Sequence, residues 1–163
     1  MNRSVAFKLV LVVFLLGLAG VLFWKLSPAG DPRDDQAYFY DLKEQKLFVA
    51  KRSLIPPIPG VKGAEGAGVR AIVISTNGNP KDPAGRKIAY LEKYAPELKR
   101  VLEAVQAGKV TDVPTREARQ AMIYVKRPAD AEWVAVNTAE GVKVMSEWSA
   151  PGRDGRLPIV CSP

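Results

Sequence analysis

Histidine is absent from the 163-residue sequence, and cysteine occurs once, at Cys161. Without histidine the chain lacks the commonest general base, the Ser-His-Asp and Cys-His catalytic arrangements, and any zinc site built on imidazole. A single cysteine excludes an intrachain disulfide, a Cys-x-x-Cys redox pair and a thiolate metal cage. We therefore expect a non-enzymatic protein with no catalytic residues, no cofactor and no bound metal.

Long runs of basic residues are also missing, although lysine and arginine total 24 against 17 acidic residues. The adjacent basic pairs are Lys51-Arg52, Arg86-Lys87, Lys99-Arg100 and Lys126-Arg127. Nucleic-acid-binding domains usually concentrate positive charge in one patch or stripe. The charge pattern predicts solvated faces and no nucleic-acid partner, and it leaves open an attraction to anionic lipids or envelope polymers.

The first 26 residues contain no acidic residue and one long apolar stretch. Residues 5–26 are interrupted only by Lys8 and Lys25, whose long side chains can reach the membrane interface. A helix of this length spans about 33 Å, enough to cross a hydrocarbon core of about 30 Å. We expect residues 5–26 to form a transmembrane helix in contact with membrane lipid, between a cytoplasmic tail (1–4) and a linker (27–36).

The basic N-terminal flank predicts the orientation of this segment. Arg3 and Lys8 have no acidic neighbour, which favours an N-terminus inside the cytoplasm. A domain of residues 37–163 then lies outside the bacterial cytoplasmic (inner) membrane. The alternative is a cleaved signal peptide, but the apolar stretch exceeds the usual length and ends at Trp24-Lys25, typical of an interfacial stop. Both interpretations keep the domain extracytoplasmic.

The pattern of residues 37–163 predicts a small α+β domain with an antiparallel sheet of about five short strands. Residues 38–42 and 47–50 are typical of two strands joined by a polar turn. Residues 69–75 are rich in β-branched side chains, which indicates a buried strand. Three prolines make residues 55–59 an extended connector rather than a central strand.

One long helix is predicted over residues 82–108. Asp82-Pro83 is typical of an N-cap followed by a first-turn proline, and apolar residues from Ile88 to Val105 recur at three- and four-residue spacing. Pro96 removes one backbone donor, so we expect a kink there. The apolar stripe of this helix would pack on the sheet.

In the C-terminal third of the chain, the sequence predicts one or two short helices and two paired strands. Residues 114–121 fit a short helix, and residues 122–125 and 132–136 fit paired strands. Residues 138–148 begin with the spacing of a capping box, which favours a short helix, with a strand over 142–147 as the alternative.

Acidic residues provide the first candidate for chemistry. Asp34 and Asp35 fall in the linker, and Asp41 and Glu44 fall at a hairpin turn, where water would hold their pKa values near normal. These positions favour solvated carboxylates over a catalytic pair.

Two other features could bind a ligand. Free N–H groups at a helix start near Arg86 and Lys87 could hold an anion, although a plain capping turn explains the same residues. Trp133, Trp148 and the aromatic strand at 38–40 could form a stacking surface. Strand alternation places Tyr38 and Tyr40 on one face, which predicts that one face is core and the other an interface.

Seven short landmarks follow one another along the chain. They are Tyr38-Phe39-Tyr40-Asp41-Leu42, Leu47-Phe48, Ile55-Pro56-Pro57-Ile58, Val69-Arg70-Ala71, Tyr90-Leu91-Glu92-Lys93-Tyr94, Glu132-Trp133-Val134 and Cys161. In this order they resemble a family of small bacterial bitopic, or single-pass, envelope proteins of unknown function. The resemblance implies an anchored envelope domain and implies no activity.

These observations together predict a membrane-anchored envelope protein that acts as an accessory or assembly subunit. Its partner would be a protein in a membrane or envelope complex. The alternative is an anchored binding module for an anionic envelope polymer or lipid surface. Salt separates the two, because an electrostatic contact weakens as ionic strength rises whereas an apolar contact persists.

Overall fold

The computed structural model describes residues 16–17, 19, 35–152 and 155–163. The chain divides into two compact units, Met1–Pro32 and Arg33–Pro163, and every element named below belongs to the second. The predicted transmembrane segment, residues 5–26, lies outside the described residues except at three positions. Among the residues described, no helix is both long enough and apolar enough to cross a bilayer.

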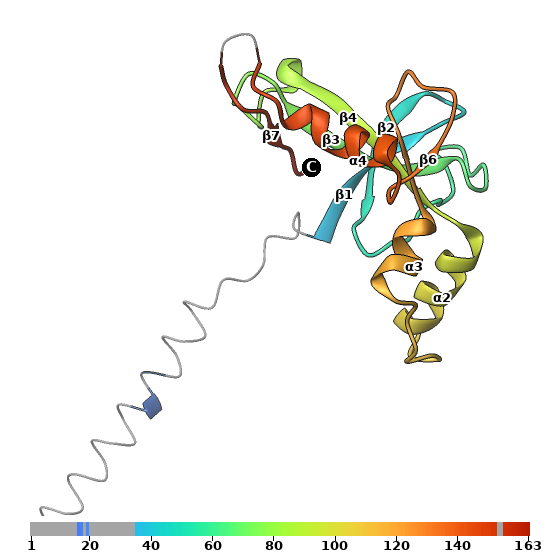
Figure 1. Ribbon diagram of the computed structural model, residues 1–163. Coiled ribbons are helices and arrows are strands. Elements are labelled where there is room, and N and C mark those ends of the chain that lie inside the picture. Colours follow the sequence, from blue (N-terminus) through green and yellow to red (C-terminus); the bar gives the residue numbers. More distant parts are fainter. Residues whose placement is uncertain (1–15, 18, 20–34, 153–154) are drawn as a thin grey trace, which may run out of the picture. The chain divides into compact units, whose positions relative to one another are not determined.

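Seven strands form one antiparallel sheet (Figure 1). They are β1 (Gln36–Asp41), β2 (Lys46–Lys51), β3 (Gly68–Ser75), β4 (Arg86–Tyr94), β5 (Ile123–Lys126), β6 (Val134–Ala135) and β7 (Ile159–Val160). The strand order is β2-β1-β3-β4-β5-β6, and β7 pairs with the end of β3. The edge strand β2 begins and ends with lysine, and the opposite edge strand β6 is two residues long.

The described helices are short. They are α2 (Pro96–Gln106), α3 (Arg116–Ala121) and α4 (Ala139–Ser146), with 3₁₀ turns η2 (Pro83–Gly85) and η3 (Glu147–Ser149). In Figure 1, α2 and α3 lie together, and both line one cavity. Helix α4 packs against β4, β5 and β6.

The expected fold class, which joined an N-terminal transmembrane helix to a domain of about five strands and one long kinked helix, is wrong in the architecture of the domain. The sheet has seven strands, and residues 86–94 form the central strand β4 instead of a helix. Pro96 occupies the first turn of α2, where a missing N–H costs no internal hydrogen bond, so it starts a helix instead of kinking one.

A β-bulge explains why β4 has a helix-like pattern. The register with β3 shifts between Ile72 and Val73, which leaves Ala89 as the extra residue on β4. One extra residue shifts the alternation of side chains by one position, so residues three apart across the bulge share a face. Ile88 and Leu91 therefore join one cluster, although they are three residues apart.

The other predicted elements are confirmed. The hairpin forms as β1 and β2, and the β-branched segment forms β3. The short helix forms as α3, the strand pair forms as β5 and β6, and the helical interpretation of residues 138–148 is correct. Thr138 caps α4 by accepting from the N–H of Gly141 at 3.1 Å.

The two faces of the sheet are covered differently. On one face, Val144 of α4 packs against Val125 and Val136. On the other face, the buried residues Val69, Ala71 and others are surrounded by side chains from strands, from the β1–β2 turn and from the segment around Trp133 and Cys161. Within the described residues, this second cluster includes no side chain from a helix.

A buried carboxylate holds the β1–β2 turn and the loop after Ile58 together. Asp41 is fully buried, and its oxygens accept from the backbone N–H groups of Lys43 at 2.9 Å, Glu44 at 3.0 Å and Val61 at 2.7 Å. A Cβ atom at Gly60 would lie 2.2 Å from this carboxylate, so glycine is needed there. The expectation that water surrounds Asp41 is wrong, because the loop closes over it.

Asp41 makes the stability of the domain depend on pH. The N–H of Glu44, with those of Val61 and Lys43, lowers the pKa of Asp41, although burial opposes the shift. Because the folded pKa lies below the unfolded value of about 3.9, this stabilisation is present above that pH and is lost as pH falls through the folded value. We expect Asp41→Asn to lower the thermal midpoint at neutral pH and to flatten the acid limb of the stability curve. Glu65→Gln, on the exposed loop, is the control and should follow the wild type.

Helix α4 leaves no room for a side chain at Gly141. An added Cβ would lie 2.1 Å from the carbonyl oxygen of Ala135. We expect Gly141→Ala to lower the free energy of unfolding by about 1–3 kcal/mol, measured by urea denaturation. Val142→Ala on the same helix removes a side chain that is 54% exposed and should change it little. Equal stability of the two variants would contradict the close contact.

Candidate functional site

The face of the sheet without helical residues carries the candidate site. Strand alternation and register bring six side chains to this face, which we call the Trp133 face. They are Tyr40 and Leu42 near the β1–β2 turn, Leu47 on β2, Lys93 on β4, Lys126 on β5 and Trp133. The expectation that Tyr38 and Tyr40 share a face is confirmed, because both belong to this cluster and Phe39 does not.

Trp133 lies within reach of two ammonium groups. The Nζ atom of Lys93 is 4.5 Å from the centre of the indole ring, and that of Lys126 is 5.4 Å from it. Leu91 pairs with Lys126 across the strands, so Lys93, two residues further along β4, lies diagonally opposite Lys126 on the same face. The ammonium groups are attracted to the negative face of the indole ring, so the three side chains form one cation–π cluster.

The charge of the two lysines is not neutralised by a neighbouring acid. In the described part of the chain, no ion pair includes Lys93 or Lys126, and the ammonium of Lys126 donates to the backbone carbonyl of Asp130 at 2.8 Å. Burial lowers the pKa of Lys93, and the charge of Lys126 lowers it further. An anionic group beside them would relieve this repulsion, so the pair is complementary to an acidic surface.

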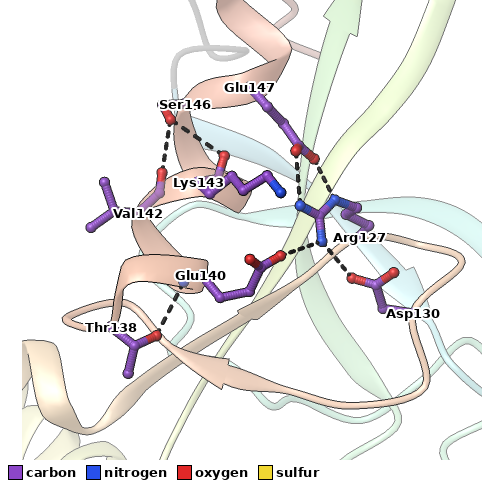
Figure 2. A network of polar contacts seen from close by, with 9 residues as sticks. Arg127, Asp130, Thr138, Glu140, Val142, Lys143, Ser146 and Glu147 are labelled. Atoms are coloured by element: carbon purple, nitrogen blue, oxygen red, sulfur yellow. Dashed lines mark hydrogen bonds and ion pairs between the residues drawn. The ribbon is translucent and has the colours of Figure 1, made fainter.

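Arg127 holds the loop that presents Trp133 (Figure 2). Its guanidinium donates to both carboxylate oxygens of Glu147, to Asp130 at 3.0 Å and to Glu140 at 2.9 Å. These contacts join the β5–β6 loop to α4 and η3. They raise the pKa of Arg127, and the hydrogen bonds from Arg127 lower the pKa of Glu147. Hydrogen bonds from one guanidinium to Glu147, Glu140 and Asp130 therefore keep the loop in place.

The other residues singled out in the sequence lie elsewhere. Asp34 falls outside the described residues, Asp35 is exposed, and Glu44 pairs with Lys62 at 2.7 Å. The structure thus brings these acids into no common cleft. The indole N–H of Trp148 is buried without an acceptor and lies away from the Trp133 face, in a cavity beside Pro151.

Near Arg86 and Lys87 the structure has the plain capping turn that the sequence favoured over an anion site. Asp82 caps a single 3₁₀ turn, and the chain then enters β4, so no helix N-terminus faces these residues. The guanidinium of Arg86 is occupied instead, since it donates to the carbonyl of Pro80 at 2.7 Å and to the hydroxyl of Tyr38 at 2.7 Å.

In the part of the chain that the structure describes, no three acidic or cysteine side chains lie close enough together to hold a metal ion.

The sequence did not predict Lys93 and Lys126 as site residues, because residues 86–94 were expected to form a helix. The pattern that marks this site is a lysine near the end of each of two paired strands, with a tryptophan nearby. It can be recognised only after both segments have been identified as strands.

We expect Arg127→Met to loosen the β5–β6 loop without unfolding the domain. Amide hydrogen exchange of residues 127–133 should become faster, because the loop loses its contacts to α4 and η3. The thermal midpoint should fall by only a few degrees, since largely exposed ion pairs contribute little to stability. Lys109→Met, on an exposed turn, is the control. Unchanged exchange in the variant would show that Arg127 does not hold the loop.

No family model, curated protein or solved structure matches this chain. The resemblance to single-pass envelope proteins stays a prediction, and the site must be interpreted from its own chemistry.

Proposed function

We propose that this protein is a non-enzymatic, membrane-anchored envelope protein whose domain binds a partner protein through the Trp133 face. Residues 5–26 would hold it in the bacterial cytoplasmic membrane with the N-terminus inside and the domain outside. In this role it would be an accessory or assembly subunit of a membrane or envelope complex.

The observation that supports the proposal is that Trp133 lies beside the ammonium groups of two lysines, on a face whose cluster includes no described helix. Tryptophan is among the residue types that contribute most binding energy at protein interfaces, whereas charged groups at the rim mainly set the specificity. Val49, which pairs with Tyr38 on this face, is 45% exposed and extends the apolar area beyond the lysines. The partner surface would therefore have an apolar centre and carboxylates placed to meet Lys93 and Lys126.

A second candidate is an anionic envelope polymer or lipid surface, and the same two lysines favour it. An anionic polymer needs the charges but makes little use of Leu42, Leu47 and Val49. The half-buried and exposed apolar side chains around Trp133 therefore favour a protein.

The test is binding of the full chain, purified in a mild detergent, to the complex that co-purifies with it. We expect Trp133→Ala to weaken that binding at least about tenfold, as truncation of a central aromatic anchor does. Lys93→Glu combined with Lys126→Glu should abolish it. Lys109→Glu together with Lys143→Glu makes the same change of charge away from the Trp133 face and should leave binding intact.

Salt and competition decide between the two candidates. A protein contact should persist in high salt and should not be displaced by vesicles of anionic lipid. Release by salt together with displacement by those vesicles would favour the polymer or lipid candidate. Co-purification of the Trp133 and lysine variants at the wild-type level, or migration of the protein alone in every mild detergent, would contradict the proposal.

A further inference from the structure

Helix α2 covers its side of the sheet incompletely. Only Leu98 is fully buried, whereas Leu102 and Val105 on the same apolar stripe are half-buried. Polar contacts hold the helix at both ends. Lys99 donates to the carbonyl of Pro57, and Gln106 donates to the carbonyl of Ser53 at 2.9 Å. The helix is thus fixed over the connector while its apolar stripe remains partly open.

Two cavities flank this stripe. One, of about 270 Å³, lies between α2 and the segment from Arg52 to Ile55, and the other, of about 190 Å³, lies between α2 and α3. Tyr94 and Leu102 line both cavities, so the two form one groove divided by these side chains. We call it the α2 groove.

A half-buried guanidinium lies at one end of the α2 groove. Arg70 is oriented by its Nη2 atom, which donates to the carbonyls of Arg52 at 2.8 Å and Leu54 at 2.9 Å, and it lies 5.7 Å from the ring centre of Phe39. Among the described residues its Nε–H is buried and has no acceptor. A buried donor without a partner costs free energy comparable to a lost hydrogen bond, so a ligand that accepts from this guanidinium would relieve part of that cost.

The charge around the α2 groove is positive. Arg52 and Arg70 line the larger cavity, Arg116 and Arg119 line the smaller one, and no carboxylate lines either among the residues described. Glu92 lies opposite Arg70 across the strands; burial raises the pKa of Glu92, and the charge of Arg70 opposes this shift. Within the described residues the two form no direct ion pair, so no carboxylate contacts the guanidinium directly.

We propose that the α2 groove binds a single-chain amphiphile with one carboxylate, which accepts from the guanidinium of Arg70 while the chain lies along Leu102 and Tyr94. A carboxylate matches the site because this guanidinium lines the cavity, is held in place through Nη2 and has no direct carboxylate partner among the described residues. The apolar lining, from Leu54 and Ile55 to Val105 and Ile123, contacts the hydrocarbon chain. This site is separate from the Trp133 face and does not depend on the proposed partner.

The test uses decanoate with a photoreactive diazirine at the end of its chain. The full protein, in nanodiscs of zwitterionic phosphatidylcholine, is irradiated with this probe, and the labelled peptides are identified by mass spectrometry. We expect labelling on α2, on α3 or on residues 52–55. Unlabelled decanoate should displace the probe, and decanol should be at least about tenfold weaker because it lacks the charge that Arg70 recognises.

Two variants test the contacts independently. Arg70→Gln should reduce labelling at least about tenfold, but it also removes the hydrogen bonds to the carbonyls of Arg52 and Leu54. Leu102→Trp fills the α2 groove and leaves the guanidinium untouched, and it should abolish labelling. Arg100→Gln, on the exposed side of α2, and Trp133→Ala should both label as the wild type.

Three results would overturn the proposal. Decanol could displace the probe as well as decanoate does, labelling could fall outside the α2 groove, or Leu102→Trp could label normally. A last arm replaces the zwitterionic lipid with anionic phosphatidylglycerol. Labelling should persist there, and its loss would assign the groove to a phospholipid instead of a carboxylate.

Discussion

The pairing of β3 with β4 is the constraint on which both candidate sites depend. Because β4 is central, alternate residues point to opposite faces, and Lys93 and Tyr94 are separated by the thickness of the sheet. Lys93 meets Lys126 and Trp133 on one side, while Tyr94 joins Arg70 and α2 on the other. A shift of one residue in this register would exchange the two environments. The bulge at Ala89 confines the irregularity to one end of the strand and leaves the functional end regular.

The two sites use positive charge in different ways. Lys93 and Lys126 present ammonium groups at the surface of a broad apolar face, which suits a large partner with acids around an apolar centre. Arg70 presents one guanidinium at the wall of a groove beside α2, which suits one acidic group on a small molecule. Both sites rest on cations without direct carboxylate partners, although acidic residues are plentiful elsewhere in the chain. The acids near the surface instead gather around Arg127.

The sequence predicts correctly those helices and strands that are marked by patterns among neighbouring residues. The β1–β2 hairpin, β3, α3 and α4 all follow from alternation, turn residues or a cap. Strand β4 could not be predicted in this way, because its bulge gives Ile88 and Leu91 a helical spacing and its two faces both carry apolar groups. The burial of Asp41 was equally inaccessible, since it depends on Val61, twenty residues away, closing over the turn. The Trp133 site was predicted in part, as an aromatic surface, but its lysines become neighbours only through strand pairing.

The edge strand β2 limits the ability of two copies of this domain to join their sheets. An exposed strand edge offers unpaired N–H and C=O groups to any other strand, which is the usual route to edge-to-edge aggregation. Joining two domains through β2 would bring the ammonium groups of Lys46 and Lys51 from both copies into close proximity. At the opposite edge, β6 is too short to template another strand. Crowding many copies onto one surface would therefore leave the domains as separate particles instead of extending their sheets into a fibril.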